Sequence, residues 1–223
     1  MISHQGVSVY KAVFARLSQV LLTVGVSFLL ISCAPTRPAI ETSSWQVLPV
    51  RTGAVRKPHS NVWLKVGAFN VSPPYDGRSL VYRLGDQRYE TDFYNGYVSL
   101  PSEMIGNATR QWINQSGIFS MTVGEGNTLF PYYTLQASVD EFYGDYRIRP
   151  EAVVSIEFFL TTTTTAKKDP IISKNRYTKR VVLKDNTPHA LVAGQQQALE
   201  EILNLFEGDL YQTTATLPKP LGR

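Results

Sequence analysis

Few side chains in this sequence are suited to catalysis. The 223 residues include one cysteine, Cys33, and three histidines. Of these, His59 falls in a predicted loop and His189 in the first turn of a predicted helix. No G-x-S-x-G, H-E-x-x-H or Walker motif occurs. Asp140 and Glu141 are adjacent on a predicted strand, where neighbours point to opposite faces, so they form no glycosidase pair. The residue types favour a non-enzymatic protein, for which we expect no cofactor and no metal.

Cys33 nevertheless marks a site of chemistry, because it ends an apolar run, VLLTVGVSFLLISC, at residues 20–33. Lys11 and Arg16 precede this run, and the first acidic residue is Glu41. A basic start and a short apolar stretch indicate a secretory signal, since a spanning helix needs roughly 20 apolar residues.

The residues that close the run, Leu-Ile-Ser-Cys, match the bacterial lipobox. In that motif the thiol is alkylated with diacylglycerol, the signal is cut before the cysteine, and the new N-terminus is acylated. An uncleaved anchor and an ordinary signal peptide are the alternatives. We predict a signal peptide at 1–32 and a lipid anchor at Cys33, since several acyl chains suffice for stable membrane attachment.

The residues that follow Cys33 indicate which membrane the lipoprotein is sorted to. Ala34 and Pro35 follow Cys33, whereas an Asp at the first of these positions retains enteric lipoproteins at the inner membrane. We therefore expect the periplasm-facing outer membrane. Residues 33–44 form the lipidated start and tether, in which the 11 residues from Ala34 to Ser44 reach at most about 40 Å.

Length and composition limit how the rest of the chain can fold and what it can bind. Removing 32 of 223 residues leaves 191, enough for one domain with a proper core. Removal of Lys11 and Arg16 lowers the number of Lys and Arg residues from 22 to 20, against 18 Asp and Glu residues. This small positive charge does not indicate binding to nucleic acid. The single thiol is used for lipid, so packing alone must stabilise the fold.

Hydrophobic periodicity predicts an α+β fold. Helix signals are Pro101 at a helix start with Gly117 as its cap, and Thr187 before Pro188 with Gly208 as the end. We expect strands at 45–50, 62–71, 80–84, 88–93, 118–123, 132–142, 151–162 and 177–183. The prediction is one domain at 45–210, with a mixed and mostly antiparallel sheet, two long helices packed on one side, and a flexible tail at 211–223.

A cluster of Tyr and Arg marks the predicted hairpin. Aromatic residues and Arg are typical of protein interfaces. The alternative is that half of them face the core or pair across the hairpin, and the sequence leaves both interpretations open. The candidate partner-binding residues are Pro73, Pro74, Tyr75, Arg78, Tyr82, Arg83, Tyr94 and Tyr97.

Three motifs in order carry a family resemblance. They are SPPYDGRSLVYR at 72–83, RYETDFYNGYVSLPSEMI at 88–105, and SGIF at the end of the helix at 116–119. The chain resembles the auxiliary lipoprotein family of MCE-type ABC transporters, which includes paraquat-inducible protein C. The likeness covers about 150 residues, more weakly toward 210. One departure lies at 95–98, where relatives often carry a Trp and prolines, and it bears on partner choice.

The resemblance implies a non-catalytic outer-membrane lipoprotein that docks an MCE-domain protein and its inner-membrane ABC permease and ATPase. Such systems move lipids between the two membranes. A closed homo-oligomeric ring would match the MCE ring, with the hairpin and the edge at 161–165 as candidate surfaces. Lys167 and Lys168 argue against pairing at that edge. The alternative function is a lipoprotein that assists assembly of an outer-membrane β-barrel.

Overall fold

The computed structural model describes residues 41–59, 61–129, 131–162 and 170–217. The predicted signal peptide, Cys33 and most of the tether lie outside these residues. So do 163–165, Lys167 and Lys168, on which the expected sheet edge depended, and the end of the predicted tail from 218 on.

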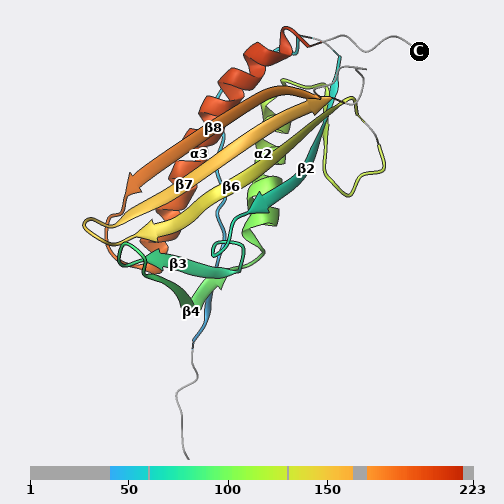
Figure 1. Cartoon of the computed structure of the whole chain (residues 1–223). Helices are drawn as coiled ribbons and strands as arrows, with labels where there is room; N and C mark the ends of the chain where they lie inside the picture. Colours follow the sequence, from blue (N-terminus) through green and yellow to red (C-terminus); the bar gives the residue numbers. More distant parts are fainter. Residues whose placement is uncertain (1–40, 60, 130, 163–169, 218–223) are drawn as a thin grey trace, which may run out of the picture. The chain divides into compact units, whose positions relative to one another are not determined.

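The described residues form a single domain of two helices and an eight-stranded mixed sheet, which confirms the α+β prediction. The elements are β1 (Ser43–Trp45), β2 (Trp63–Val71), β3 (Ser79–Arg83), β4 (Tyr89–Tyr97), α2 (Pro101–Ser116), β5 (Met121–Val123), β6 (Tyr133–Asp145), β7 (Glu151–Thr162), β8 (Ile171–Val182) and α3 (Pro188–Thr214). The long strands β6, β7 and β8 lie side by side (Figure 1).

The described part of the sheet contains both antiparallel and parallel strand pairings. The antiparallel pairings are β3–β4, β6–β7 and β7–β8, and the parallel ones are β1–β4, β2–β5, β2–β6 and β3–β6. The expected mixed sheet is confirmed, but "mostly antiparallel" fits only the long strands. One of the parallel pairings follows from α2, which carries the chain to the end of the sheet where β2 and β6 begin, so that β5 runs in the direction of β2.

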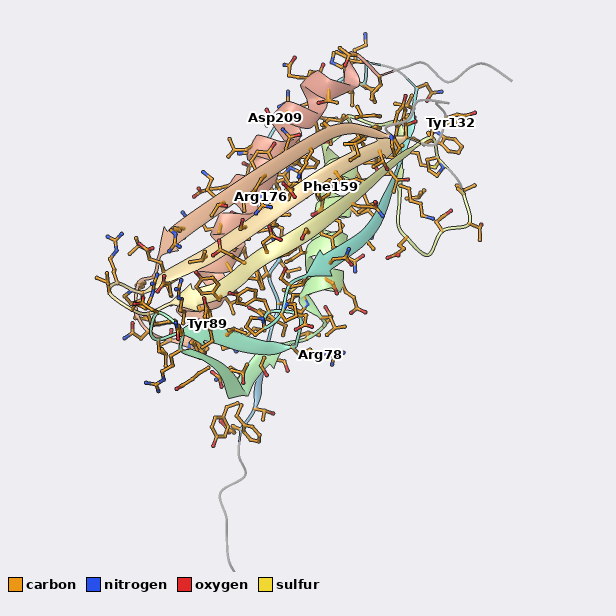
Figure 2. All side chains as sticks on the ribbon, in the orientation of Figure 1. Arg78, Tyr89, Tyr132, Phe159, Arg176 and Asp209 are labelled. Atoms are coloured by element: carbon orange, nitrogen blue, oxygen red, sulfur yellow. The ribbon has the colours of Figure 1, made fainter. Side chains whose placement is uncertain are left out.

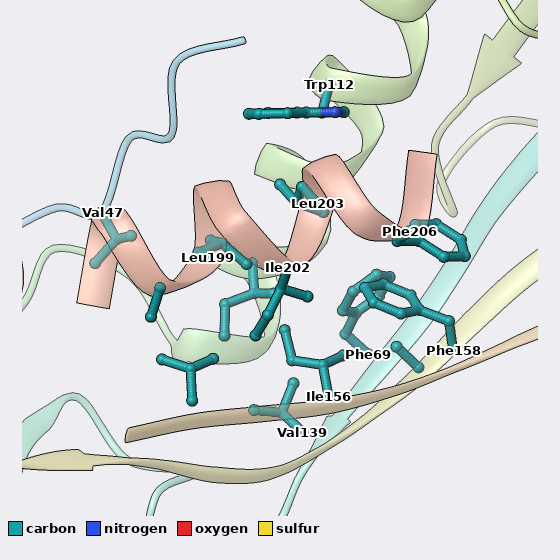
Figure 3. Close-up of a cluster of buried hydrophobic side chains, with 14 of the residues drawn as sticks. Val47, Phe69, Trp112, Val139, Ile156, Phe158, Leu199, Ile202, Leu203 and Phe206 are labelled. Carbon is teal, nitrogen blue, oxygen red and sulfur yellow. The ribbon is translucent and has the colours of Figure 1, made fainter. Parts of the chain in front are cut away.

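Both helices cover the same face of the sheet, as predicted (Figure 1). In the core between these layers, Phe206 of α3 stacks on Phe158 of β7 with 4.0 Å between ring centroids. Ile202 of α3 and Ile156 of β7 are fully buried beside this pair (Figure 3). Complete burial of such a side chain stabilises the fold by about 1.5–3 kcal/mol.

Helix signals in the sequence place three of the four helix ends. Pro101 begins α2, and Gly117 caps it in the left-handed region at φ 71°. The Thr187 hydroxyl accepts a hydrogen bond from the Ala190 N–H at 3.2 Å, which caps α3 at its start.

The predicted end of α3 at Gly208 is wrong, because the helix continues to Thr214. A Cβ at Gly208 would meet nothing within 4 Å, so this glycine lies on an open helix surface. Leu210 and Thr214 are buried, and their packing outweighs the roughly 1 kcal/mol that a glycine costs inside a helix. Residues 211–214, expected in the flexible tail, therefore belong to α3.

Strand predictions failed where the backbone pairs elsewhere. The first strand lies at Ser43–Trp45 rather than 45–50, because the Val47 N–H donates to the Met104 sulfur and the Val50 N–H to Glu200. In β2 a register shift between Val66 and Phe69 breaks the simple alternation of faces, so that both side chains are buried in the core. β5 is shorter than predicted, and β8 begins six residues before Tyr177.

A segment of the chain at 46–56, which we call the strap, is fixed to the helices by one buried carboxylate. Glu207 of α3 accepts hydrogen bonds from Arg51 Nε at 2.7 Å, Arg56 Nε at 2.9 Å and Trp112 Nε1 at 2.9 Å. Burial acts to raise the pKa of Glu207, but the two guanidinium groups outweigh it and the pKa is lowered. The ionised Glu207 therefore joins the strap, α2 and α3.

The other face of the sheet, here called the open face, carries no helix of the described chain (Figure 1). Arg176 of β8 lies on it and pairs with Asp140 of β6 at 2.6 Å and Glu157 of β7 at 3.3 Å. The register shift between Val139 and Glu141 also brings Glu141 to this face, where it accepts a hydrogen bond from the Tyr143 hydroxyl at 3.3 Å. The expectation that Asp140 and Glu141 point to opposite faces is therefore wrong.

Candidate binding surfaces

The candidate partner-binding residues divide by burial. Tyr75 and Tyr97 are buried, and Tyr82 and Arg83 are half-buried. Pro73, Pro74, Arg78 and Tyr94 are exposed. Only the exposed group is available to another molecule without opening the fold.

Tyr97 fastens the hairpin to α3. Its hydroxyl donates to Gln195 Oε1 at 2.8 Å, and its ring lies 5.4 Å from that of Phe142. Complete burial raises the pKa of Tyr97. This side chain supports the fold.

A tyrosine cluster closes the hairpin onto the open face. Tyr75 stacks on Tyr143 of β6 at 5.3 Å between ring centroids, and Tyr89 meets both rings edge-on. The Arg83 guanidinium lies 5.5 Å from the Tyr89 ring centroid, within cation–π range. Burial raises the pKa of Tyr75 and Tyr143. The cluster therefore packs the hairpin against β6, and Tyr89 lies at its exposed edge (Figure 2).

A turn within β4 projects two aromatic side chains into solvent. Four residues, 92–95, lie between the register positions Thr91 and Gly96, which pair with Val81 and Ser79 of β3. The turn presents Phe93, 79% exposed, and Tyr94, 50% exposed, with 5.3 Å between their ring centroids.

Asp92 fixes this turn. Its Oδ1 accepts from the N–H groups of Tyr94 at 2.8 Å and Asn95 at 2.9 Å, and its Oδ2 accepts from the Tyr82 hydroxyl at 2.6 Å. Burial acts to raise the pKa of Asp92, but these hydrogen bonds lower it overall. Phe93 is not among the candidate residues that the sequence pattern marks. An Asp whose side chain can cap the next N–H groups was the available signal for the turn.

A second exposed surface lies where β2, β5 and β6 begin. Trp63, 41% exposed, and Met121, 39% exposed, are register partners on β2 and β5. Tyr132, 37% exposed, directly precedes β6 (Figure 2). We call Trp63, Met121 and Tyr132 the apolar end. Sequence reasoning treated them as ordinary strand or loop positions, because exposure on a sheet face depends on which strands become neighbours.

No group of three or more metal-ligating residues gathers in the part of the chain that the structure describes. The rings of His59 and Tyr211 are stacked with 4.3 Å between their centroids, and the His189 ring centroid lies 5.9 Å from that of Trp45.

An open cavity of about 350 Å³ beside α2 and β2 is lined by Glu103, Arg110 and Gly106 among others. Among the described helices none is sufficiently long and apolar to cross a bilayer.

Solved structures share this architecture. Protein XCC0632 from Xanthomonas campestris, of the DUF330 family, superposes with a TM-score of 0.61 at 16% identity, covering 78% of this chain and 94% of that one. A second, uncharacterised protein has a TM-score of 0.61 at 17% identity, covering 76% and 99%. At these identities the likeness establishes the fold. No curated protein matches the sequence.

The fold thus defines a two-layer α+β domain with one open sheet face. A family model matches residues 46–204 of it, and the chain belongs to that family, the ABC-type transport auxiliary lipoprotein components. The family resemblance seen in the motifs of the hairpin and of α2 is confirmed.

Proposed function

We propose that this protein is the non-enzymatic, outer-membrane lipoprotein of an MCE-type lipid-transport system. It is anchored through Cys33 and binds an MCE-domain protein that works with an ABC permease and ATPase. The match of residues 46–204 to the auxiliary lipoprotein family carries the proposal. The lipobox supports it, because the expected anchor lies ten residues before β1.

The fold separates the two ends that such a role requires. The chain enters the domain at β1, beside β4, whereas the apolar end lies where β6 begins (Figure 1). The 13 residues of β6 span about 40 Å. With the β1 side held near the membrane, the apolar end is presented to a partner that reaches across the periplasm.

The apolar end has the composition of a contact surface. Trp and Tyr are enriched among residues that dominate binding energy, and Met adapts to different partners. Lys65 is the cation nearest in sequence to Trp63. We therefore propose that Trp63 and Met121 contact the MCE protein, in place of the buried Tyr75 and Tyr97.

Co-purification from detergent-extracted envelopes tests this function. The wild type is expected to recover the MCE protein encoded nearby, and Trp63→Ala with Met121→Ala is expected to reduce recovery at least tenfold. Ile148→Ala, at a fully exposed apolar position in the β6–β7 turn, is the matched control. Thermal denaturation of each variant separates lost contact from lost fold. Recovery of a β-barrel protein and no MCE protein would contradict the proposal and favour the assembly role.

A further inference from the structure

The exposed aromatic pair on β4 lies beside the point where the chain enters the domain. β1 pairs with β4 in the register Ser43 to Asn95, one residue after Tyr94. The Trp45 indole N–H of β1 donates to the Asn95 side-chain oxygen at 3.1 Å. The strand that follows the tether and the turn that carries the pair are thus bonded to each other.

The chain between Cys33 and β1 is short. Ser43 follows Cys33 by ten positions, and ten consecutive Cα–Cα steps span at most about 35 Å. Acyl chains on Cys33 would therefore hold the bilayer surface within that distance of β1. The anchor belongs to the proposed function, and this inference rests on it.

From this placement we propose that Phe93 and Tyr94 insert into the lipid interface of the membrane that holds the acyl chains of Cys33. A single exposed aromatic residue is ordinary, but this one is a contacting pair at the side where the tether joins. Aromatic side chains favour the membrane interface, where an apolar ring enters the acyl boundary and a tyrosine hydroxyl stays among the headgroups.

The turn is prepared for such contact. Asp92 bonds to the backbone of Tyr94 and Asn95 and to the Tyr82 hydroxyl, so the rings are presented by a fixed backbone. A surface that is already ordered loses less conformational entropy on binding. Arg78, exposed and opposite this end of β4, adds a cation near lipid phosphates (Figure 2).

Depth-dependent quenching in the full-length, acylated protein tests the proposal. Cys33 is the only native cysteine, so after acylation Phe93→Cys provides a unique site for an environment-sensitive fluorophore. Ile148→Cys, fully exposed in the β6–β7 turn, is the matched control. Both proteins are placed in phosphatidylethanolamine–phosphatidylglycerol vesicles with or without nitroxide-labelled lipid.

We expect at least twofold quenching by the nitroxide lipid at 93 and none at 148. Equal, weak quenching at both positions would overturn the proposal, as would shielding of 93 from an aqueous quencher without quenching by lipid, which would indicate a protein contact. Intact mass reports acylation separately. An acylated protein with an unquenched label leaves the anchor intact and overturns only this inference, whereas an unacylated protein contradicts the anchor and, with it, the inference that rests on it.

Discussion

At the scale of single residues, burial divides side chains that look alike in the sequence. Tyr94 and Tyr97 are three positions apart on β4, yet Tyr94 is half exposed and Tyr97 is 4% exposed against α3. The turn fixed by Asp92 lies between Thr91 and Gly96 and separates their environments. Buried Tyr97 is therefore unavailable to a partner, and the exposed Arg78 and Tyr94 pass from the partner-binding hypothesis to the membrane proposal.

Loss of Glu207 should cost the domain much of its stability. Glu207→Ala leaves the Arg51 side chain, 4% exposed, without its carboxylate, and a broken buried ion pair costs about 3–5 kcal/mol. Chemical denaturation measures the free energy of unfolding. The control is Glu90→Ala, which removes an exposed pair with Arg88 and should change stability little. A loss below about 1 kcal/mol for Glu207→Ala would contradict the role of Glu207 as the strap's anchor.

Asp145 should give the domain an acid-sensitive stability. The hydrogen bond from Arg147 lowers the pKa of Asp145 to about 2, and Arg180 adds to the effect. Because the folded pKa lies below the unfolded value near 3.9, the stabilisation is present above about pH 4 and is lost as pH falls toward 2. This lowering of the pKa from about 3.9 to about 2 corresponds to about 2.5 kcal/mol. Unfolding measured from pH 6 to 2 should lose that dependence in Asp145→Asn but keep it in Asp86→Asn, at an exposed position.

At the scale of elements, short sequence signals correctly predicted the helix ends that are fixed by backbone geometry or by a capping side chain. Pro101, Gly117 and Thr187 mark helix ends through backbone geometry or a cap, and all three ends lie where expected. Gly208 failed as a signal because tertiary packing of Leu210 extends the helix past it. The shifts in β2 and β6 also escaped prediction, because a bulge depends on the strand alongside.

The two glycines give a matched test of the helix assignments. Gly208→Ala should stabilise the domain by about 0.5–1 kcal/mol, since it fills open space inside a helix. Gly117→Ala should destabilise it by more than 1 kcal/mol, because φ is 71° and the new Cβ would lie 2.8 Å from the Arg56 carbonyl oxygen. Thermal denaturation ranks the pair. Destabilisation by Gly208→Ala would indicate that α3 ends there after all.

The candidate site was less predictable than the fold. The Tyr/Arg pattern drew attention to the hairpin and left interface and core roles open, and strand alternation could not show that the stack of Tyr75 on Tyr143 closes it onto β6. Trp63 and Met121 are 58 positions apart, and only the β2–β5 pairing brings them together. Exposure on an assembled sheet face is a property of the tertiary structure.

At the scale of the whole molecule, we expect a closed ring that matches the MCE assembly. β8 is the long edge strand of the described sheet, and closed symmetry is the usual end state of identical subunits. Several weak contacts acting together would then seat the ring on its partner. Native mass spectrometry of the detergent-extracted, acylated protein measures the number of copies. A monomer, both alone and with the MCE protein, would contradict the ring and leave a one-to-one adaptor.

One end of the domain is thus proposed to face the membrane, and the other to face an MCE partner. Photo-crosslinking in intact cells tests this most directly, with a photoreactive amino acid placed at Trp63 or at Tyr94. We predict that position 63 forms an adduct with the MCE protein and that position 94 forms adducts with lipid. An MCE adduct at 94 together with none at 63 would contradict the account.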